Sequence, residues 1–393
     1  MADSVPEGSP RSIGRRAWIL LVAVLLLASA LRFYHLGRLS LWYDEVVSMR
    51  LARTPDPPSL VRLLDQVDAT RAPLHPLLLQ GWLTVFGPSD LAGRALSALC
   101  GVATCALVFW VGRLAHDTAT GLWGAWLAAW SPLLVAYSRE ARMYAWLVLA
   151  TCLAWGLLFS SRRSSSLGAR IGYALLSAAL IYSHPLGLLM AGSLALASFW
   201  NRGALGLSGG AWLSTHAAAM LAVAPWVRRY FDHAPESTVG RLPWRFLPGM
   251  PIGFIGGNRL SLLVTVGILL FGLFGARRGK AGDRRVVVEE PVAASCLLIW
   301  FAVPPLLLYA YSRVAYPIFG PPRYTLFVGP AYLLLVARGL AKLPLPHRLA
   351  LAGAGAALSA SLLETLVYAP DLKADWRAAP PTSTATRRGL PSW

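Results

Sequence analysis

Charged residues are scarce in this sequence. Only 14% of its 393 residues are Asp, Glu, Lys or Arg, whereas 56% are hydrophobic, and an average soluble domain is about 25% charged. Acids are the scarcest, with 18 Asp and Glu against 36 Lys and Arg. These proportions exclude an ordinary soluble protein and predict a membrane protein built from apolar helices.

Cysteine is also rare, and each of the four lies within an apolar run: Cys100, Cys105, Cys152 and Cys296. A thiol in such a run behaves as a small hydrophobic group. We therefore expect neither a disulfide framework nor a zinc site. The sequence also lacks an H-E-x-x-H motif and a Walker loop, so metalloprotease and ATPase mechanisms lose support.

The basic residues are spread over short loops between apolar segments, although the net charge is +18. The positive-inside rule for membrane proteins produces such a distribution. We therefore predict the lipid bilayer, and no nucleic acid, as a partner.

Eleven apolar segments are long enough to be candidate spans of a bilayer about 30 Å thick. They lie near residues 17–36, 92–112, 120–137, 143–160, 170–183, 185–200, 210–227, 260–276, 291–311, 325–341 and 348–368. A further stretch, 73–87, is ambiguous. If it lies in the interface without crossing, Arg15, Arg202, the basic cluster at 277–285 and Lys342 share one side, which is then the cytoplasm. If it crosses, this asymmetry reverses.

We therefore predict an all-α, polytopic transmembrane protein with about eleven spans. A cytoplasmic tail (1–16) precedes the transmembrane domain (17–369), whose long extracytoplasmic loops are 37–91 and 228–259. The first loop is long enough for juxtamembrane helices, because SLVRLLDQV at 59–67 has a helical period. We interpret 370–393 as a short extracytoplasmic tail or a truncated soluble domain.

Two adjacent acids, Asp44 and Glu45, follow the first apolar segment in LWYDEVVSMR. A carboxylate at a membrane boundary is most often a solvated charge at a helix end. In a loop that can fold over a cavity, however, a carboxylate flanked by arginines can accept a proton. Both acids are therefore candidate catalytic residues.

Arginines gather on the same predicted face. Arg139 and Arg142 in SREARMY are three residues apart, which would place them on one face of a helix, and Arg323 begins a later span. The planar fork of a guanidinium suits phosphate. We predict that these three arginines bind the phosphate of a lipid-linked donor; the alternative is that they reach toward the interface and pair with Glu140.

Polar and aromatic residues on this face are candidate contacts to a sugar or an acceptor. A lone histidine is more often a structural hydrogen-bonding residue than a catalyst. The predicted contacts are Glu140, Tyr144, His75, His184 and Tyr324.

Five sequence blocks, in this order, resemble a known family. They are SLWYDEVVSMRLA, APLHPLLLQGWLTVFGPSDLAGRALSAL, SPLLVAYSREARMYAWLVL, YSHPLGLL and PPRYTLFVGPAYLLLVARGL. The chain is similar, over roughly 15–377, to the bacterial branch of the protein O-mannosyltransferase and aminoarabinose transferase family of C-type (GT-C) membrane glycosyltransferases. It departs from that family at Leu77, where relatives often have a second proline after the histidine and proline.

The resemblance implies transfer of a sugar from a polyprenyl-phosphate donor to a lipid, glycan or protein acceptor, on the periplasmic or extracellular side of the inner (plasma) membrane. It points to Asp44 as the general base, with Glu45 as its neighbour, an acceptor-positioning group or the fallback base. A phosphate leaving group needs no strong acid, so one carboxylate suffices for attack with inversion.

Three questions stay open at this level. The alternative function is a non-catalytic transporter or flippase of lipid-linked saccharides, which would not need Asp44. No cofactor is predicted: adjacent acids can hold a divalent cation, but without a third carboxylate we favour a metal-independent reaction. The loop 228–259 is either an interfacial loop anchored by aromatic residues or a gate over the cavity.

Overall fold

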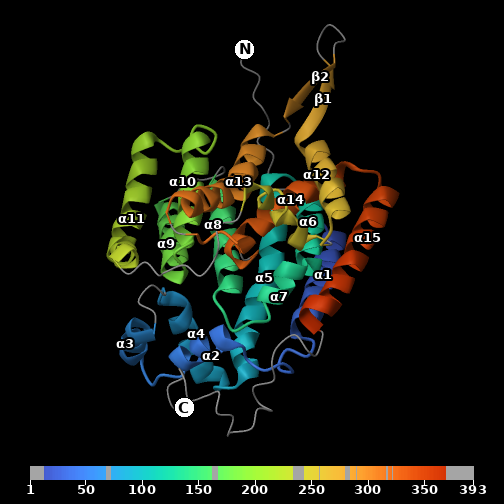
Figure 1. The fold of residues 1–393 in the computed structure, drawn as a ribbon. Helices are drawn as coiled ribbons and strands as arrows, with labels where there is room; N and C mark the ends of the chain where they lie inside the picture. The colour runs from blue at the N-terminus through green and yellow to red at the C-terminus, as the bar shows by residue number, and fades with distance from the viewer. Residues whose placement is uncertain are drawn as a thin grey trace.

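The computed structural model describes residues 13–67, 72–161, 167–232, 243–255, 257–278, 284–288, 290–315, 317–320 and 322–368. The described part is almost entirely helical (Figure 1). Its α-helices are α1 (Arg15–Phe33), α2 (Tyr43–Ala52), α3 (Pro57–Val67), α4 (Leu74–Phe86), α5 (Asp90–Ala115), α6 (Thr118–Trp130), α7 (Pro132–Tyr137), α8 (Tyr144–Ser161), α9 (Leu167–Ser183), α10 (Gly187–Trp200), α11 (Gly209–Asp232), α12 (Arg259–Leu273), α13 (Pro291–Val314), α14 (Gly329–Lys342) and α15 (Leu345–Leu363). The predicted helical fold class is confirmed.

Shorter elements join these helices. Three are 3-10 helices, η1 (Trp244–Phe246), η2 (Met250–Phe254) and η3 (Pro322–Val328), and a π-helical turn, η4, covers Glu364–Tyr368. The strands β1 (Phe274–Arg278) and β2 (Arg284–Val288) form an antiparallel hairpin. We had expected a span to continue to residue 276, but α12 ends at Leu273 and the chain turns into β1. The three consecutive valines of β2 favour an extended strand.

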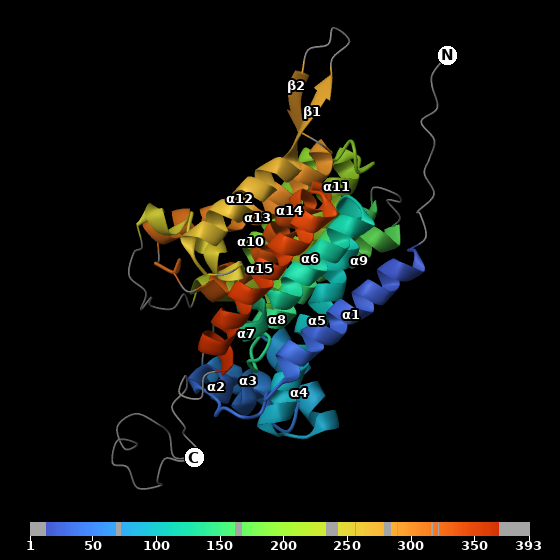
Figure 2. The same ribbon diagram turned by 90° about the vertical axis from the view of Figure 1, so that its right-hand side faces the viewer.

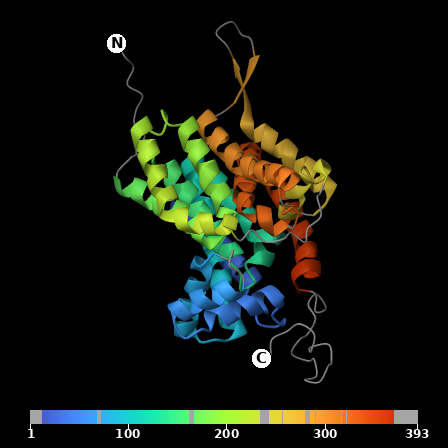
Figure 3. The same ribbon diagram turned by 60° about the vertical axis from the view of Figure 1, so that its left-hand side comes forward.

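The helices form two layers. Helices α2, α3 and α4 lie together at one end of a larger bundle, and the hairpin projects from the opposite end (Figures 1 and 3). Helix α1 begins at the hairpin end and descends to the small layer (Figure 2). The ambiguous stretch 73–87 contains α4, which lies in the small layer; that it does not cross the membrane stays a prediction.

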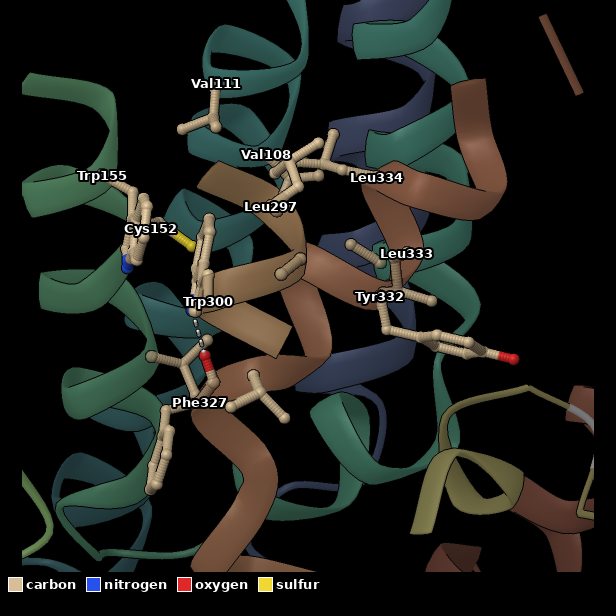
Figure 4. Packing of buried hydrophobic residues seen from close by; sticks show 14 of the residues in the cluster. Val108, Val111, Cys152, Trp155, Leu297, Trp300, Phe327, Tyr332, Leu333 and Leu334 are labelled. Atoms are coloured by element: carbon tan, nitrogen blue, oxygen red, sulfur yellow. Dashed lines mark hydrogen bonds between the residues drawn. The ribbon is translucent and has the colours of Figure 1, made fainter. Parts of the chain in front are cut away.

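The core of the bundle surrounds α14, whose residues are nearly all buried. In Figure 4, the ring of Trp155 on α8 stacks on that of Trp300 on α13, with ring centroids 4.9 Å apart. The indole Nε1 of Trp300 donates a hydrogen bond to the carbonyl oxygen of Phe327, 2.9 Å away. This bond satisfies a polar atom that would otherwise be buried without a partner, and it joins α13 to η3, which carries Arg323 into the site.

Glycines allow the closest approaches between helices. A Cβ atom on Gly121 would lie 2.4 Å from the carbonyl oxygen of Phe109 on α5, and one on Gly339 would overlap the carbonyl of Ile268 on α12. These positions exclude larger residues and bring α5 against α6 and α12 against α14.

Local signals set the ends of several helices. Ser89 and Asp117 cap α5 and α6 by accepting hydrogen bonds from the backbone N–H groups of Ala92 and Thr120. The predicted span 120–137 is divided between α6 and α7, because Pro132 begins a new helix after Ser131.

Among the described residues, four apolar segments are long enough to cross a membrane by length and composition: α1, α5, α13 and Pro322–Lys342. Shorter apolar helices such as α8, α9, α10 and α12 pack among them. These helices indicate an integral membrane protein, and each of the eleven predicted segments contains a helix. The number of spans stays a prediction.

Candidate active site

A cavity of about 300 Å³ lies between the small layer and the bundle. Helices α2 and α4 form one wall. The other wall comes from the segment before α8, the turn between α9 and α10, the end of α11, and η3. Its lining residues are Asp44, Ser48, Leu51, Ala72, His75, Pro76, Arg142, Met143, Tyr144, Ser183, His184, Pro185, Leu186, Tyr230, Ile318, Arg323 and Tyr324. Seven of the ten predicted site residues meet here: Asp44, His75, Arg142, Tyr144, His184, Arg323 and Tyr324.

The carboxylate of Asp44 lies between two arginines. Its Oδ2 is 3.5 Å from Nη2 of Arg142 and 3.7 Å from Nη1 of Arg323. Both distances exceed the roughly 2.7–2.9 Å of a strong charge-assisted hydrogen bond. In the described part of the chain, Nε of each arginine is buried without a hydrogen-bond partner. Both guanidiniums thus lie beside Asp44 without a strong hydrogen bond to its carboxylate.

Arg142 is held in place by α2. Its Nη1 donates to the backbone carbonyl of Asp44 and to Oγ of Ser48, each at 3.2 Å. The hydroxyl of Ser48 donates in turn to the same Asp44 carbonyl, at 3.0 Å. These bonds fix the position of the guanidinium relative to the helix that carries the candidate base.

Aromatic rings surround the two arginines. Arg142 lies 5.7 Å from the ring centroid of Tyr144, and Arg323 lies 5.3 Å from that of Tyr324. The ring of His184 lies 6.1 Å from Tyr144 and 6.5 Å from Tyr324. Its Nδ1 accepts a hydrogen bond from the backbone N–H of Leu186 at 3.0 Å. The rings give the cavity flat apolar faces beside its charges, a combination that suits a sugar phosphate.

His75 lines the cavity from α4, with only 3% of its surface exposed. Burial, reinforced by the positive charge of Arg142, lowers the pKa of His75 to about 3. The imidazole is therefore neutral at physiological pH, and it presents one donor and one acceptor.

Glu45 does not line the cavity, contrary to its expected place beside the reacting groups. Its side chain is fully buried against Arg94 of α5, with Nε–Oε1 and Nη2–Oε2 distances of 2.8 Å. Its Oε1 also accepts the backbone N–H of Ala141, at 2.9 Å. Glu45 thus joins α2 to α5 and to the segment that carries Arg142.

Arg94 is saturated by its partners. Besides the two bonds to Glu45, it donates to the backbone carbonyls of Leu36, Leu39 and Ser40 at 2.7–3.1 Å. These five bonds use all five N–H groups of a guanidinium. Arg94 was not among the predicted site residues. The available signal was an arginine within the apolar segment predicted at 92–112.

Arg139 and Glu140 do not line the cavity either. Nη1 of Arg139 donates to the carbonyls of Leu31, Arg32 and Tyr34 at 2.7–3.3 Å, at the end of α1. Arg139 and Arg142 were expected to share a helix face. The chain is not helical between α7 and α8, so the two side chains diverge.

The predicted loop 228–259 contributes to the cavity at one end and to the core at the other. Tyr230 on α11 reaches the cavity lining, whereas Phe254, from the same predicted loop, is buried in the core. Residues 233–242 of that loop lie outside the described residues, so the gate stays a prediction.

In the described part of the chain, no group of three or more His, Cys, Asp and Glu side chains could hold a metal ion.

Known proteins share this architecture. The model of the dolichyl-phosphate-mannose-protein mannosyltransferase family matches residues 70–228, a range that includes α4, α5 and Arg142. Apo ArnT from Cupriavidus metallidurans superposes with a TM-score of 0.62 at 16% identity, over 92% of this chain and 66% of that chain. ArnT bound to undecaprenyl phosphate gives a TM-score of 0.60 at 16% identity, over 88% of this chain and 64% of that chain.

The chain has the fold of a C-type membrane glycosyltransferase. A more distant C-type structure is the archaeal oligosaccharyltransferase AglB from Archaeoglobus fulgidus, with an inhibitory peptide and a dolichol-phosphate. Its TM-score is 0.50 at 13% identity, over 89% of this chain and 56% of that chain. The chain thus spans less than two thirds of the length of these C-type proteins. No curated protein sequence gives a match.

Proposed function

We propose that this protein transfers a sugar from a polyprenyl-phosphate donor to an acceptor hydroxyl, with inversion at the anomeric carbon. The observation that carries this proposal is the position of Asp44 between Arg142 and Arg323, in a cavity large enough for a small ligand. A carboxylate beside two guanidiniums supplies a proton acceptor and a phosphate site within one chamber.

Each group then has a distinct task. Arg142 and Arg323 hold the donor phosphate and stabilise the charge that develops on it as it leaves. The donor sugar enters between the phosphate and Asp44, which requires the two long ion pairs to open. Asp44 takes the proton from the acceptor hydroxyl, whose oxygen bonds to the anomeric carbon as the carbon–oxygen bond to the phosphate breaks. The products are the glycosylated acceptor and the polyprenyl phosphate.

Glu45 and Arg139 act through other residues in this proposal. Glu45 positions Asp44 and Arg142 through Arg94 and Ala141, and Arg139 secures the end of α1. Phosphate binding is left to the two arginines that line the cavity.

Two comparisons support the choice of donor, and the charge distribution supports the choice of membrane face. ArnT was solved with undecaprenyl phosphate and AglB with a dolichol-phosphate, so this fold accommodates polyprenyl-phosphate lipids. The site lies at the end of the bundle opposite the hairpin, whose sequence RRGKAGDRR is the most basic loop of the chain. By the positive-inside rule, this basic loop favours an extracytoplasmic position for the site.

Substitution of Asp44 tests the chemistry. The purified full-length protein is assayed with a panel of polyprenyl-phosphate hexoses, by the release of polyprenyl phosphate. Asp44→Asn should reduce release at least 100-fold, the usual contribution of a general base, while undecaprenyl phosphate still binds. The matched control, Asp90→Asn, changes an acid that does not line the cavity. Retention of most activity by Asp44→Asn would contradict the assignment, and lipid transport without release would favour a flippase.

Substitution of Arg323 tests the phosphate site. Arg323→Lys keeps the charge but loses the planar fork, and a hydrogen bond to a charged group contributes about 1.5–3 kcal/mol. We expect the Kd for undecaprenyl phosphate to rise at least tenfold. An unchanged Kd would reduce Arg323 to a structural partner of Asp44.

A further inference from the structure

A second hollow adjoins the cavity. It has a volume of about 350 Å³ and is lined by α4, α5 and α8. Its side chains are apolar, apart from His75, and include Leu78, Trp82, Phe86, Leu96 and Trp146. Leu78 and Phe86 are 37% and 57% exposed, so the hollow opens to the outer surface of α4. In a membrane protein, a hollow of this kind is accessible to lipid.

His75 is the residue that the two hollows share. It is nearly fully buried, and within the described residues its ring nitrogens have no hydrogen-bond partner. These nitrogens are not closed off from the two hollows, so a ligand there can hydrogen-bond to them, with a net gain of about 0.5–1.5 kcal/mol per bond. A neutral imidazole offers one donor and one acceptor, and a hydroxyl group complements both.

The order of groups along a ligand decides which substrate fits. In a polyprenyl-phosphate sugar the phosphate separates the chain from the sugar, so a donor chain in the apolar hollow would place its phosphate beside His75. Phosphate oxygens only accept hydrogen bonds, and they favour guanidinium donors. Arg142 and Arg323 line the polar cavity and do not line the apolar hollow. A chain that ends in a hydroxyl satisfies His75 without a cation.

We propose that the acceptor is a hydroxyl-bearing membrane lipid. Its hydrocarbon chain occupies the apolar hollow, and His75 receives its hydroxyl and directs it toward Asp44. This inference rests on the proposed function, since it identifies the acceptor class for that reaction. It assigns His75 as a specificity-determining residue and favours a lipid over a polypeptide acceptor.

Gly81 provides a way to fill the hollow without disturbing the fold. It lines the hollow, and a Cβ atom added there would meet nothing within 4 Å. Gly81→Leu should therefore fold normally and obstruct the chain. Gly192→Leu on α10 is the matched control, because a Cβ atom there also meets nothing within 4 Å and Gly192 does not line the hollow.

The experiment uses the full-length protein in detergent with a diacylglycerol that carries a diazirine in one acyl chain. After illumination, mass spectrometry should locate crosslinks within residues 78–100 and at Trp146. Gly81→Leu should reduce them at least fivefold and Gly192→Leu should not. Excess undecaprenyl phosphate should not displace the probe. Equal crosslinking in Gly81→Leu, or displacement by undecaprenyl phosphate, would overturn the proposal, the latter by assigning the hollow to the donor chain.

A second comparison isolates His75. The same probe with its hydroxyl methylated should crosslink more weakly than the parent probe in the wild-type protein. His75→Phe should abolish this preference, and His75→Gln, which keeps a donor and an acceptor, should retain it. Equal capture of both probes by the wild-type protein would refute the role of His75. Because this readout needs no turnover, it fails independently of the transferase activity.

Discussion

Glu45 and Arg94 form the buried ion pair on which the geometry of the site depends. Glu45→Ala would leave three buried donors without acceptors: Nε and one Nη2 hydrogen of Arg94, and the backbone N–H of Ala141. Glu45→Gln retains one amide oxygen but turns an NH₂ group toward a guanidinium. Both changes weaken the attachment of α2 to α5 and to the segment that carries Arg142.

The expected magnitude follows from burial. Removal of one partner of a buried ion pair costs about 3–5 kcal/mol, and we expect Glu45→Ala to lose that amount of unfolding free energy. For Glu45→Gln we expect a loss of about 2 kcal/mol, because one acceptor remains. Asp90→Asn is the control: the Asp90 and Arg53 side chains are 28% and 45% exposed at 3.5 Å, and such pairs contribute about 1 kcal/mol or less.

Thermal unfolding in one detergent, followed by tryptophan fluorescence, should rank the variants. The midpoint should fall most for Glu45→Ala, less for Glu45→Gln and least for Asp90→Asn. Activity should fall in parallel with stability in both Glu45 variants. A Glu45→Gln protein that is as stable as wild type but inactive would refute the structural role and return Glu45 to consideration as the base.

Two further predictions concern pH and topology. The pKa of His75 is about 6.5 in the unfolded chain and is lowered to about 3 in the fold, so the unfolded state binds more protons in this window and stability falls as pH falls. Between pH 7 and 5 the loss of unfolding free energy from this group is at most about 2 kcal/mol. The difference between the unfolding midpoints at these two pH values should therefore be smaller for His75→Gln than for the wild-type protein. An equal difference in the two proteins would contradict a buried neutral imidazole. For topology, Gly203→Cys in the turn after α10 should react with a membrane-impermeant maleimide only from the cytoplasm. Pro55→Cys, after α2, should react only from outside. Labelling of both cysteines from the same side would refute the assignment of 73–87 as non-crossing.

Much of this architecture could be read from the sequence, because burial in a bilayer imposes strong local constraints. Each span must be apolar over a fixed length and must satisfy its own backbone hydrogen bonds. Those requirements located every major helix of the bundle. The distribution of arginine and lysine further predicts that α4 is not a spanning segment. Asp44, Arg142 and Arg323, which line the cavity, became candidates because charges are rare in such a chain and stand out where they occur.

The tertiary structure decided which of these charged residues reach the cavity. Asp44 and Glu45 are adjacent in sequence, but successive residues of a helix point about 100° apart. Asp44 therefore faces the cavity, while Glu45 faces Arg94 on α5, 49 residues away in the chain. Arg139 and Arg142 separate because the segment between α7 and α8 is not helical. These assignments depend on long-range packing partners, which a local pattern does not contain.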